Sequence, residues 1–224
     1  MNRETSAAQR HLDLGCGTRP RNPYQRPHLC GVDIRPWSVD AAAGGPTVDY
    51  RTANLVLGPI PWPDNSFASV SAFDFLEHVP RLVVLPDGSG TRFPFIELMD
   101  EVWRVLAPGG RLYAVTPAFP SAAAFQDPTH VNFITDETHT YFCCPDALGR
   151  MYGFNGQFRA LRVQRVHPGP YTTDLAQPPP APLDAWQRRL ARALRDTLRR
   201  LRGRTPVPGW LLWELEAVKP HPHG

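Results

Sequence analysis

The chain has 224 residues, with a hydrophobic content of 42%, a charged content of 20% and a formal net charge of +3. A chain of this length buries a substantial core, so we expect residues 1–224 to form a single globular domain. Its apolar runs are shorter than the roughly 18 residues that a membrane-spanning helix requires. Its four cysteines form no C-x-x-C pair, which argues against a disulfide framework. We therefore expect a cytoplasmic protein.

The first predicted strand, residues 11–14, leads directly into the turn Gly15-Cys16-Gly17. Glycine allows the backbone to turn tightly and to approach a ligand closely, because no Cβ is in the way. The second predicted strand, residues 29–34, contains Asp33 near its end. A carboxylate roughly 20 residues after the start of a glycine turn is typical of the acid that binds a ribose in a βαβ unit. The spacing therefore predicts a ligand that contains adenosine.

Proline residues after the turn indicate which adenosine ligand fits. A dinucleotide fingerprint continues into a helix whose N-terminus faces a pyrophosphate, whereas this chain has Pro20, Pro23 and Pro27 in that stretch. Three prolines so close together disfavour a long helix. A P-loop is excluded as well, since no Gly-Lys-Ser/Thr sequence follows the turn. A ligand with ribose and adenine but no phosphate, such as S-adenosylmethionine, fits better.

The rest of the chain alternates between predicted strands and helices, which indicates a mostly parallel, three-layer α/β sheet. A helix is expected over 94–106, where apolar residues share one face after Pro94. Residues 81–92 are expected to form a loop, and residues 135–144 and 146–152 short helices. The further predicted strands are 47–50, 66–73, 111–115, 158–166 and 210–219.

Four motifs in this order resemble the class I S-adenosylmethionine-dependent methyltransferases, in the type 11-like group with the LEHV signature. They are the glycine motif at 13–17, the acid Asp33, the stretch PWPDNSFASVSAFDFLEHV at 61–79, and MDEVWRVLAPGGRLYAVTP at 99–117. The resemblance covers about residues 11–166 and a last strand near 210–219. It implies a Rossmann-like sheet of order 3-2-1-4-5-7-6 with an antiparallel last strand, and S-adenosyl-L-methionine as the cofactor.

The resemblance also implies roles for individual residues. Asp33, with Ile34 beside it, would bind the ribose. His78 would border the methionine end of the cofactor, or else cap the following helix. Phe73 would line the cofactor, or else belong to the core. The residues expected at the methionine part are Asp13, Gly15, Cys16 and Gly17, and those expected at the adenine are Asn54 and Leu55.

The chain departs from the family pattern at several positions. Arg19 stands where the family often has a third glycine, and Ala68 where it usually has an aspartate. Asn54 stands where the family commonly has an acid that hydrogen-bonds to the adenine amino group. Few residues precede the first predicted strand, where the family usually has one or two helices that cap the cofactor.

The segment after the fifth strand, residues 116–142, is the expected acceptor site, since ligands bind outside the carboxyl ends of parallel strands. His130 is the candidate general base or acceptor contact, with Asp127 orienting it. The alternative is that His130 and Asn132 hold the loop together by hydrogen bonds. A metal site formed by Asp127, His130 and His139 is disfavoured, because the spacing fixes no third ligand; no metal site is predicted.

An insertion separates the last two strands at residues 167–209. It contains a proline-rich spacer at 177–182 and an amphipathic stretch, 183–204, predicted to be helical. Over residues 185–205, eight arginines against Asp196 make this part of the chain strongly basic. The first interpretation is that this helix packs onto the domain through its leucines and exposes its basic face to solvent. Contact with an anionic membrane or an acidic ligand is the second interpretation, and binding to nucleic acid would be non-specific.

The sequence thus favours methyl transfer to the oxygen or nitrogen of a small-molecule or glycan-type acceptor, because no target-recognition domain is attached. A cofactor-binding protein with a degenerate, non-catalytic pocket is the first alternative. An NAD-dependent oxidoreductase is the second, and Pro20 disfavours it. The acceptor atom and the oligomeric state do not follow from the sequence.

Overall fold

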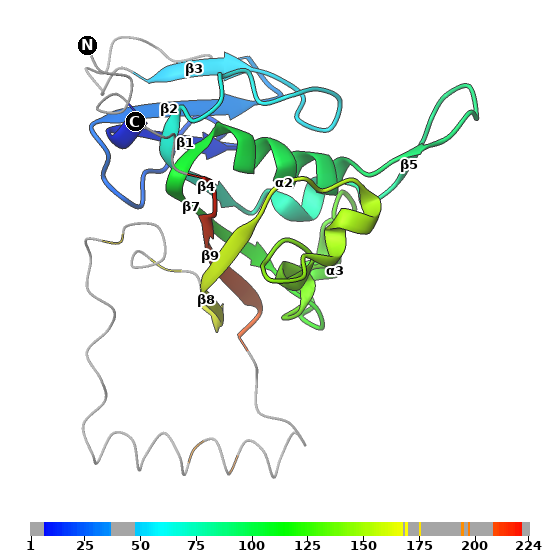
Figure 1. The fold of residues 1–224 in the computed structure, drawn as a ribbon. Coiled ribbons are helices and arrows are strands. Elements are labelled where there is room, and N and C mark those ends of the chain that lie inside the picture. The colour runs from blue at the N-terminus through cyan, green and yellow to red at the C-terminus, as the bar shows by residue number, and fades with distance from the viewer. Residues whose placement is uncertain are drawn as a thin grey trace.

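A computed structural model describes residues 7–36, 48–167, 169, 175, 194, 197 and 208–220. Its main sheet has seven strands in the order β3-β2-β1-β4-β7-β9-β8 (Figure 1). The strands are β1 Arg10–Leu14, β2 His28–Asp33, β3 Asp49–Thr52, β4 Phe67–Phe73, β7 Leu106–Pro117, β8 Phe158–Val166 and β9 Trp210–Ala217. In chain order of these seven strands, the arrangement is 3-2-1-4-5-7-6, which confirms the predicted fold class.

Strand direction determines where a site can form. Strands β3, β2, β1, β4 and β7 pair in parallel, whereas β9 runs antiparallel to both of its neighbours, β7 and β8. The carboxyl ends of β1, β2 and β4 therefore lie along one edge of the sheet. In open α/β sheets, ligands bind outside this edge.

Helix α2, Pro94–Val105, covers one face of the sheet (Figure 1). Pro94 stands in its first turn, where a missing N–H leaves no hydrogen bond unmade. The buried side chains of α2 include Leu98, Met99 and Val102, and they share one large apolar core with Leu12 of β1. Burial of this amphipathic face holds the helix on the sheet, since a helix of this length has little stability alone.

The face of the central strands opposite α2 carries buried polar side chains, whereas a buried sheet face is normally apolar. His11 and Asp13 of β1 stand beside Ser69 and Ser71 of β4 in the pairing register, and all four side chains are buried. A second, smaller apolar cluster lies on this face nearer the carboxyl edge. It consists of Phe73, Tyr113, Val115, Val166 and Leu212.

Several local expectations are corrected by the structure. Strand β3 begins two residues later than predicted, and β7 begins at Leu106 rather than at residue 111. The predicted loop at 81–92 contains a hairpin of β5, Val83–Val84, and β6, Thr91–Arg92. Gly88 at φ 70° supplies the left-handed residue in the turn of this hairpin.

Short helices occupy the connection between β7 and β8. The two predicted ones are reduced to the 3-10 helices η3, Thr138–Tyr141, and η4, Leu148–Tyr152. A short helix that the sequence did not predict, α3, spans Ala123–Gln126. After the glycine turn, residues 15–27 contain no helix, which confirms the prediction made from the prolines.

Strand β8 ends at Val166 and β9 begins at Trp210, so the predicted insertion at 167–209 would lie between these two strands. Its proline-rich spacer, 177–182, lies outside the described residues. The predicted helix at 183–204 lies outside them as well, apart from Leu194 and Thr197. Among the described residues, no helix combines the length and apolar character needed to cross a membrane.

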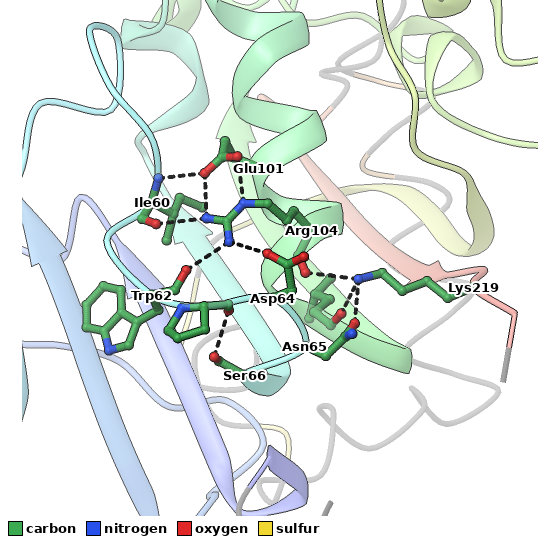
Figure 2. A network of polar contacts seen from close by, with 10 residues as sticks. Ile60, Trp62, Asp64, Asn65, Ser66, Glu101, Arg104 and Lys219 are labelled. Carbon is green, nitrogen blue, oxygen red and sulfur yellow. Dashed lines mark hydrogen bonds and ion pairs between the residues drawn. The ribbon is translucent and has the colours of Figure 1, made fainter. Parts of the chain in front are cut away.

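Figure 2 shows how the C-terminal end of α2 is tied to the loop before β4. The Arg104 guanidinium donates to the carbonyl oxygens of Ile60 and Trp62, both at 2.9 Å. It also pairs with Glu101 at 2.7 Å and Asp64 at 2.8 Å. Lys219, just after β9, donates to the Arg104 and Leu106 carbonyl oxygens at 2.9 and 2.7 Å. One planar side chain thus connects α2 to the approach of β4.

We predict that Arg104→Lys lowers the free energy of unfolding by about 2–3 kcal/mol, because an ammonium group replaces a five-donor fork and each lost bond contributes about 1 kcal/mol. Urea denaturation measures the change. Arg92→Lys is the matched control, since the Arg92 and Glu97 side chains are 37% and 42% exposed, more than those of Arg104 and Glu101 at 27% and 23%, and solvent-exposed pairs contribute little. Equal effects of the two substitutions would contradict the proposed importance of this network.

Candidate functional site at the carboxyl edge of the sheet

The glycine turn lies at the end of β1 and has the conformation that the sequence predicts. Gly15 and Gly17 have φ values of 60° and 56°, in the left-handed region that favours glycine. A Cβ on Gly15 would lie 2.4 Å from Cδ2 of Phe75, so this aromatic ring packs directly on the turn. The Cys16 side chain faces strand β2, since a Cβ on Gly31 would lie 2.8 Å from its Sγ.

The Asp33 carboxylate is held next to this turn. Its Oδ2 accepts the backbone N–H of Gly17 at 2.9 Å, and its Oδ1 accepts the backbone N–H of Arg35 at 3.0 Å. The side chain is 8% exposed, with the Arg35 guanidinium 3.6 Å away. An ionised carboxylate offers about four lone-pair sites, so each oxygen retains accepting capacity. The arrangement fits a ribose with two neighbouring hydroxyl groups.

Ile34, and the residues expected at the adenine, Asn54 and Leu55, lie after the ends of the adjacent strands β2 and β3. Ile34 follows Asp33 and is 61% exposed. The Ala53 N–H donates to the Asp33 carbonyl oxygen at 3.0 Å, which brings the next residues to this part of the edge. Asn54 Oδ1 accepts the N–H of Val56 at 3.0 Å, and Leu55 is buried.

Asp13 lies beneath the turn in a buried polar network. Its Oδ1 accepts the Ser71 hydroxyl at 2.6 Å, and its Oδ2 accepts the Arg21 backbone N–H at 2.8 Å. The His11 ring bridges the hydroxyls of Ser69 and Ser71, each at 2.8 Å. Burial raises the pKa of Asp13 to about 7 and lowers the pKa of His11 to about 3. By accepting the Arg21 N–H, Asp13 anchors the loop that follows the glycine turn.

Phe73 ends β4 with its ring in the smaller apolar cluster. The Arg21 guanidinium lies over that ring, 4.8 Å from its centroid, and donates to the Phe73 carbonyl oxygen at 3.3 Å. This environment favours the core role of Phe73. Arg21 is a residue that the sequence did not single out, since nothing in the proline-rich loop predicts that it folds back over β4.

A second cluster forms where the LEHV signature meets the segment after β7. The 3-10 helix η2, Leu76–His78, follows β4. The backbone N–H groups of Val131 and Asn132 donate to the Glu77 carbonyl oxygen at 2.9 and 3.0 Å. The Asn132 side chain donates to the Leu76 carbonyl oxygen at 3.1 Å and accepts from Arg81 Nε at 2.7 Å. The two segments are thus fixed to one another.

His130 faces the LEHV turn from this segment. Its Nδ1 lies 3.3 Å from the carbonyl oxygen of Ala124, and its Nε2 lies 3.9 Å from Oε1 of Glu77. The His78 ring is 4.8 Å from the His130 ring, centroid to centroid. Asp127 Oδ1 accepts the backbone N–H and the hydroxyl of Thr129, at 2.8 and 2.7 Å. The Ala124 carbonyl group therefore orients the His130 ring in this structure, while Asp127 shapes the turn.

Glu77 is the residue of this cluster that sequence reasoning missed. Its side chain is 1% exposed. Its Oε2 accepts the Thr116 hydroxyl at 2.8 Å, whereas Oε1 accepts from no described residue. Burial raises the pKa of Glu77 to about 7. The only sequence signal was its place beside His78 in the LEHV signature.

Comparison with known proteins agrees with the fold. Residues 12–114 match the model of a family described as a methyltransferase domain. No curated protein matches the chain in sequence. A solved S-adenosylmethionine-dependent methyltransferase from Archaeoglobus fulgidus aligns with a TM-score of 0.53 and 16% identity, over 94% of this chain and 87% of that one.

Two further solved structures are similar in fold. One is from the complex between the Haloferax volcanii Trm112 methyltransferase activator and a proposed methyltransferase. It has a TM-score of 0.52 and 19% identity, over 96% of this chain and 85% of that one. The other is the (4+2)-cyclase SpnF, with a TM-score of 0.51 and 18% identity, over 95% of this chain and 76% of that one.

Residues 12–114 are therefore similar to the methyltransferase-domain family, and the chain has the fold of class I S-adenosylmethionine-dependent methyltransferases. This similarity favours S-adenosylmethionine as the cofactor. The presence of a cyclase among the structural neighbours shows that this fold hosts more than one reaction. The reaction of this chain has to be argued from its own residues.

The buried Asp13–His11 network predicts an unusual dependence of stability on pH. Asp13 binds its proton more tightly in the folded than in the unfolded chain, so its contribution to the free energy of unfolding falls as pH rises from 3.8 to about 7. His11 binds its proton less tightly when folded, so its contribution rises with pH between about 3 and 6.5. The two contributions oppose one another over most of this range.

Asp13→Asn removes the pH-dependent contribution of the Asp13 carboxyl group to the free energy of unfolding. Relative to wild type, the variant is therefore expected to gain stability progressively as pH rises from about 4 to about 7. Urea denaturation without cofactor at pH 4.5, 6 and 8 measures this difference. His11→Gln should show the opposite trend, losing stability relative to wild type as pH rises. A difference between Asp13→Asn and wild type that is constant with pH would show that the carboxyl group does not titrate as described.

Proposed function

We propose that the chain transfers a methyl group from S-adenosylmethionine to an oxygen or nitrogen atom of a small-molecule or glycan-type acceptor. The observation that carries this proposal is the contact between the Gly17 N–H and the Asp33 carboxylate, 2.9 Å long, at the ends of neighbouring strands β1 and β2. This contact supports a ribose site, because it holds the Asp33 carboxylate beside a turn that a ligand can approach closely. The family match over residues 12–114 supports the choice of cofactor.

The cofactor would lie along the carboxyl edge. Asp33 would accept hydrogen bonds from the ribose hydroxyls, and the exposed Ile34 would contact the adenine ring. Phe75, which packs on Gly15, would form one wall near the methionine part. Other residues proposed to line the cofactor are Asp13, Gly15, Cys16 and Gly17 at the methionine part, Asn54 and Leu55 at the adenine, and His78 near the sulfur.

The acceptor would bind between η2 and the segment that contains His130. The cofactor supplies an activated methyl group, and the protein must hold the acceptor atom about 3 Å from it, aligned and away from water. The Ala124 carbonyl oxygen accepts from His130 Nδ1, so Nε2 carries the lone pair. With a hydroxyl acceptor, His130 Nε2 would take the proton as the O–C bond forms and the S–C bond breaks. A neutral amine needs no such base.

The cofactor site is tested by substituting its acid. Asp33→Asn keeps the shape of the side chain but replaces one accepting oxygen by a donor. We expect calorimetry to show a loss of S-adenosylmethionine affinity of at least 10-fold, because hydrogen bonds to charged groups contribute about 1.5–3 kcal/mol. Asp87→Asn, in the turn of the β5–β6 hairpin, is the control and should bind as wild type does. Unchanged affinity of Asp33→Asn would refute the proposed ribose site.

Turnover is tested with methyl-labelled S-adenosylmethionine against a panel of hydroxyl- and amine-bearing sugars and phenols. With a hydroxyl acceptor, we expect His130→Gln to lower kcat by roughly 100-fold or more, the usual range for a general base, while cofactor affinity stays unchanged. His139→Gln is the matched control, since His139 Nδ1 donates to the carbonyl oxygen of the nearby Asp136 at 2.8 Å. Cofactor binding without turnover of any acceptor would favour the alternative, a non-catalytic cofactor-binding protein.

A further inference from the structure

Three side chains from two separate segments of the chain converge beside the proposed acceptor site. Glu77 and His78 come from η2, and His130 comes from the segment after β7. One ligand atom of each residue lies within 4.8 Å of those of the other two. The polar contacts that orient these side chains determine which atoms are available to a ligand.

Both histidines use Nδ1 to bond to the protein. His130 Nδ1 lies 3.3 Å from the carbonyl oxygen of Ala124, which only accepts, so Nδ1 carries the proton. His78 Nδ1 lies 2.9 Å from the Thr129 hydroxyl, which donates its own hydrogen to Asp127 at 2.7 Å. His78 Nδ1 must therefore donate as well. In both neutral rings, the lone pair is left on Nε2.

Glu77 adds a third accepting atom to the same place. Its Oε2 is occupied by the Thr116 hydroxyl, but the buried Oε1 accepts a hydrogen bond from no described residue. That oxygen points at His130, 3.9 Å from Nε2. A buried acceptor without a donor costs free energy, and here it lies close to the imidazole rings of both histidines. A cation bound between the three side chains would give this oxygen a partner.

We propose that Glu77, His78 and His130 bind a divalent transition metal ion, Zn²⁺ in the first instance. Two imidazoles and a carboxylate are a ligand set of catalytic zinc sites, which keep a fourth position open. Metal-ligating histidines usually donate their other N–H to a carbonyl or a carboxylate. His130 does so to Ala124, and the Thr129 hydroxyl links His78 to Asp127 in the same way.

The site must contract to hold the ion. Zinc lies about 2.0–2.2 Å from such ligands, so neighbouring ligand atoms are closer together than the 3.9 Å between His130 Nε2 and Glu77 Oε1. Glu77 is fixed by burial and by Thr116. The partly exposed His78 ring, hydrogen-bonded through Thr129, is the side chain with room to adjust.

This inference rests on the proposed function and narrows its substrate class. A metal ion lowers the pKa of an oxygen ligand, so the site favours a hydroxyl acceptor over an amine. The proton would leave to solvent before the oxygen attacks the methyl carbon. His130 would then serve the acceptor as a ligand of the metal rather than as the base itself.

Metal binding is measured on the full chain after dialysis against EDTA and removal of the chelator. His221 and His223, in the C-terminal sequence PHPHG, also offer imidazoles, so all measurements use a His221→Gln/His223→Gln background. We expect one Zn²⁺ per chain by calorimetry and a d–d absorption band when Co²⁺ is added.

His130→Gln and Glu77→Gln should each weaken Zn²⁺ binding by at least 10-fold. His139→Gln is the matched control and should bind zinc normally.

Circular dichroism confirms that each metal-free variant is folded, and His130→Gln serves as the test if Glu77→Gln is not. Absence of stoichiometric Zn²⁺ binding, or binding that His130→Gln leaves unchanged, would overturn the inference. S-adenosylmethionine is titrated separately into the same samples. Cofactor binding and turnover in EDTA without zinc binding would leave the proposed function intact and refute the metal site, whereas zinc binding without cofactor binding would refute the proposed function alone.

Discussion

The candidate site depends on one contact, the hydrogen bond from the Gly17 N–H to the Asp33 carboxylate. It joins the turn after β1 to the end of β2, so the glycine turn and the acid form one rigid surface. This contact requires the left-handed backbone of Gly17 and the parallel register that places Asp13 opposite Gly31. In most βαβ units a helix follows such a turn. Here a helix-free loop follows instead, and side-chain contacts hold the turn in place.

Those contacts explain the polar face of the sheet. Asp13 accepts the Arg21 N–H, and Ser71 and His11 extend the network across β1 and β4. Arg21 continues it by covering Phe73. A buried polar network is favourable only when each of its polar atoms has a hydrogen-bond partner. The geometry of the glycine turn is therefore linked to the protonation state of Asp13. Stability and the geometry of the glycine turn are therefore coupled through the same side chains.

Much of the fold and of the cofactor edge was predictable, because periodic apolar segments and glycine turns are local signals. Helix α2 and β8 have nearly the expected bounds, and the absence of a helix at 15–27 followed from the prolines. The hairpin at 83–92 and the later start of β3 were missed, since short exposed strands have weak patterns. The environment of His130 was not predictable. Its partners Ala124 and Glu77 are brought to it by tertiary folding, and no sequence spacing relates Glu77 to His130.

The central claim is that S-adenosylmethionine binds along the carboxyl edge of β1 and β2, with its ribose on Asp33. A crystal structure of the chain with S-adenosylhomocysteine tests it most directly. We predict that both ribose hydroxyls donate to the Asp33 carboxylate, that the adenine lies against Ile34, and that the homocysteine part passes Gly15 toward η2. A ligand bound elsewhere, or a ribose that does not contact Asp33, would contradict the account.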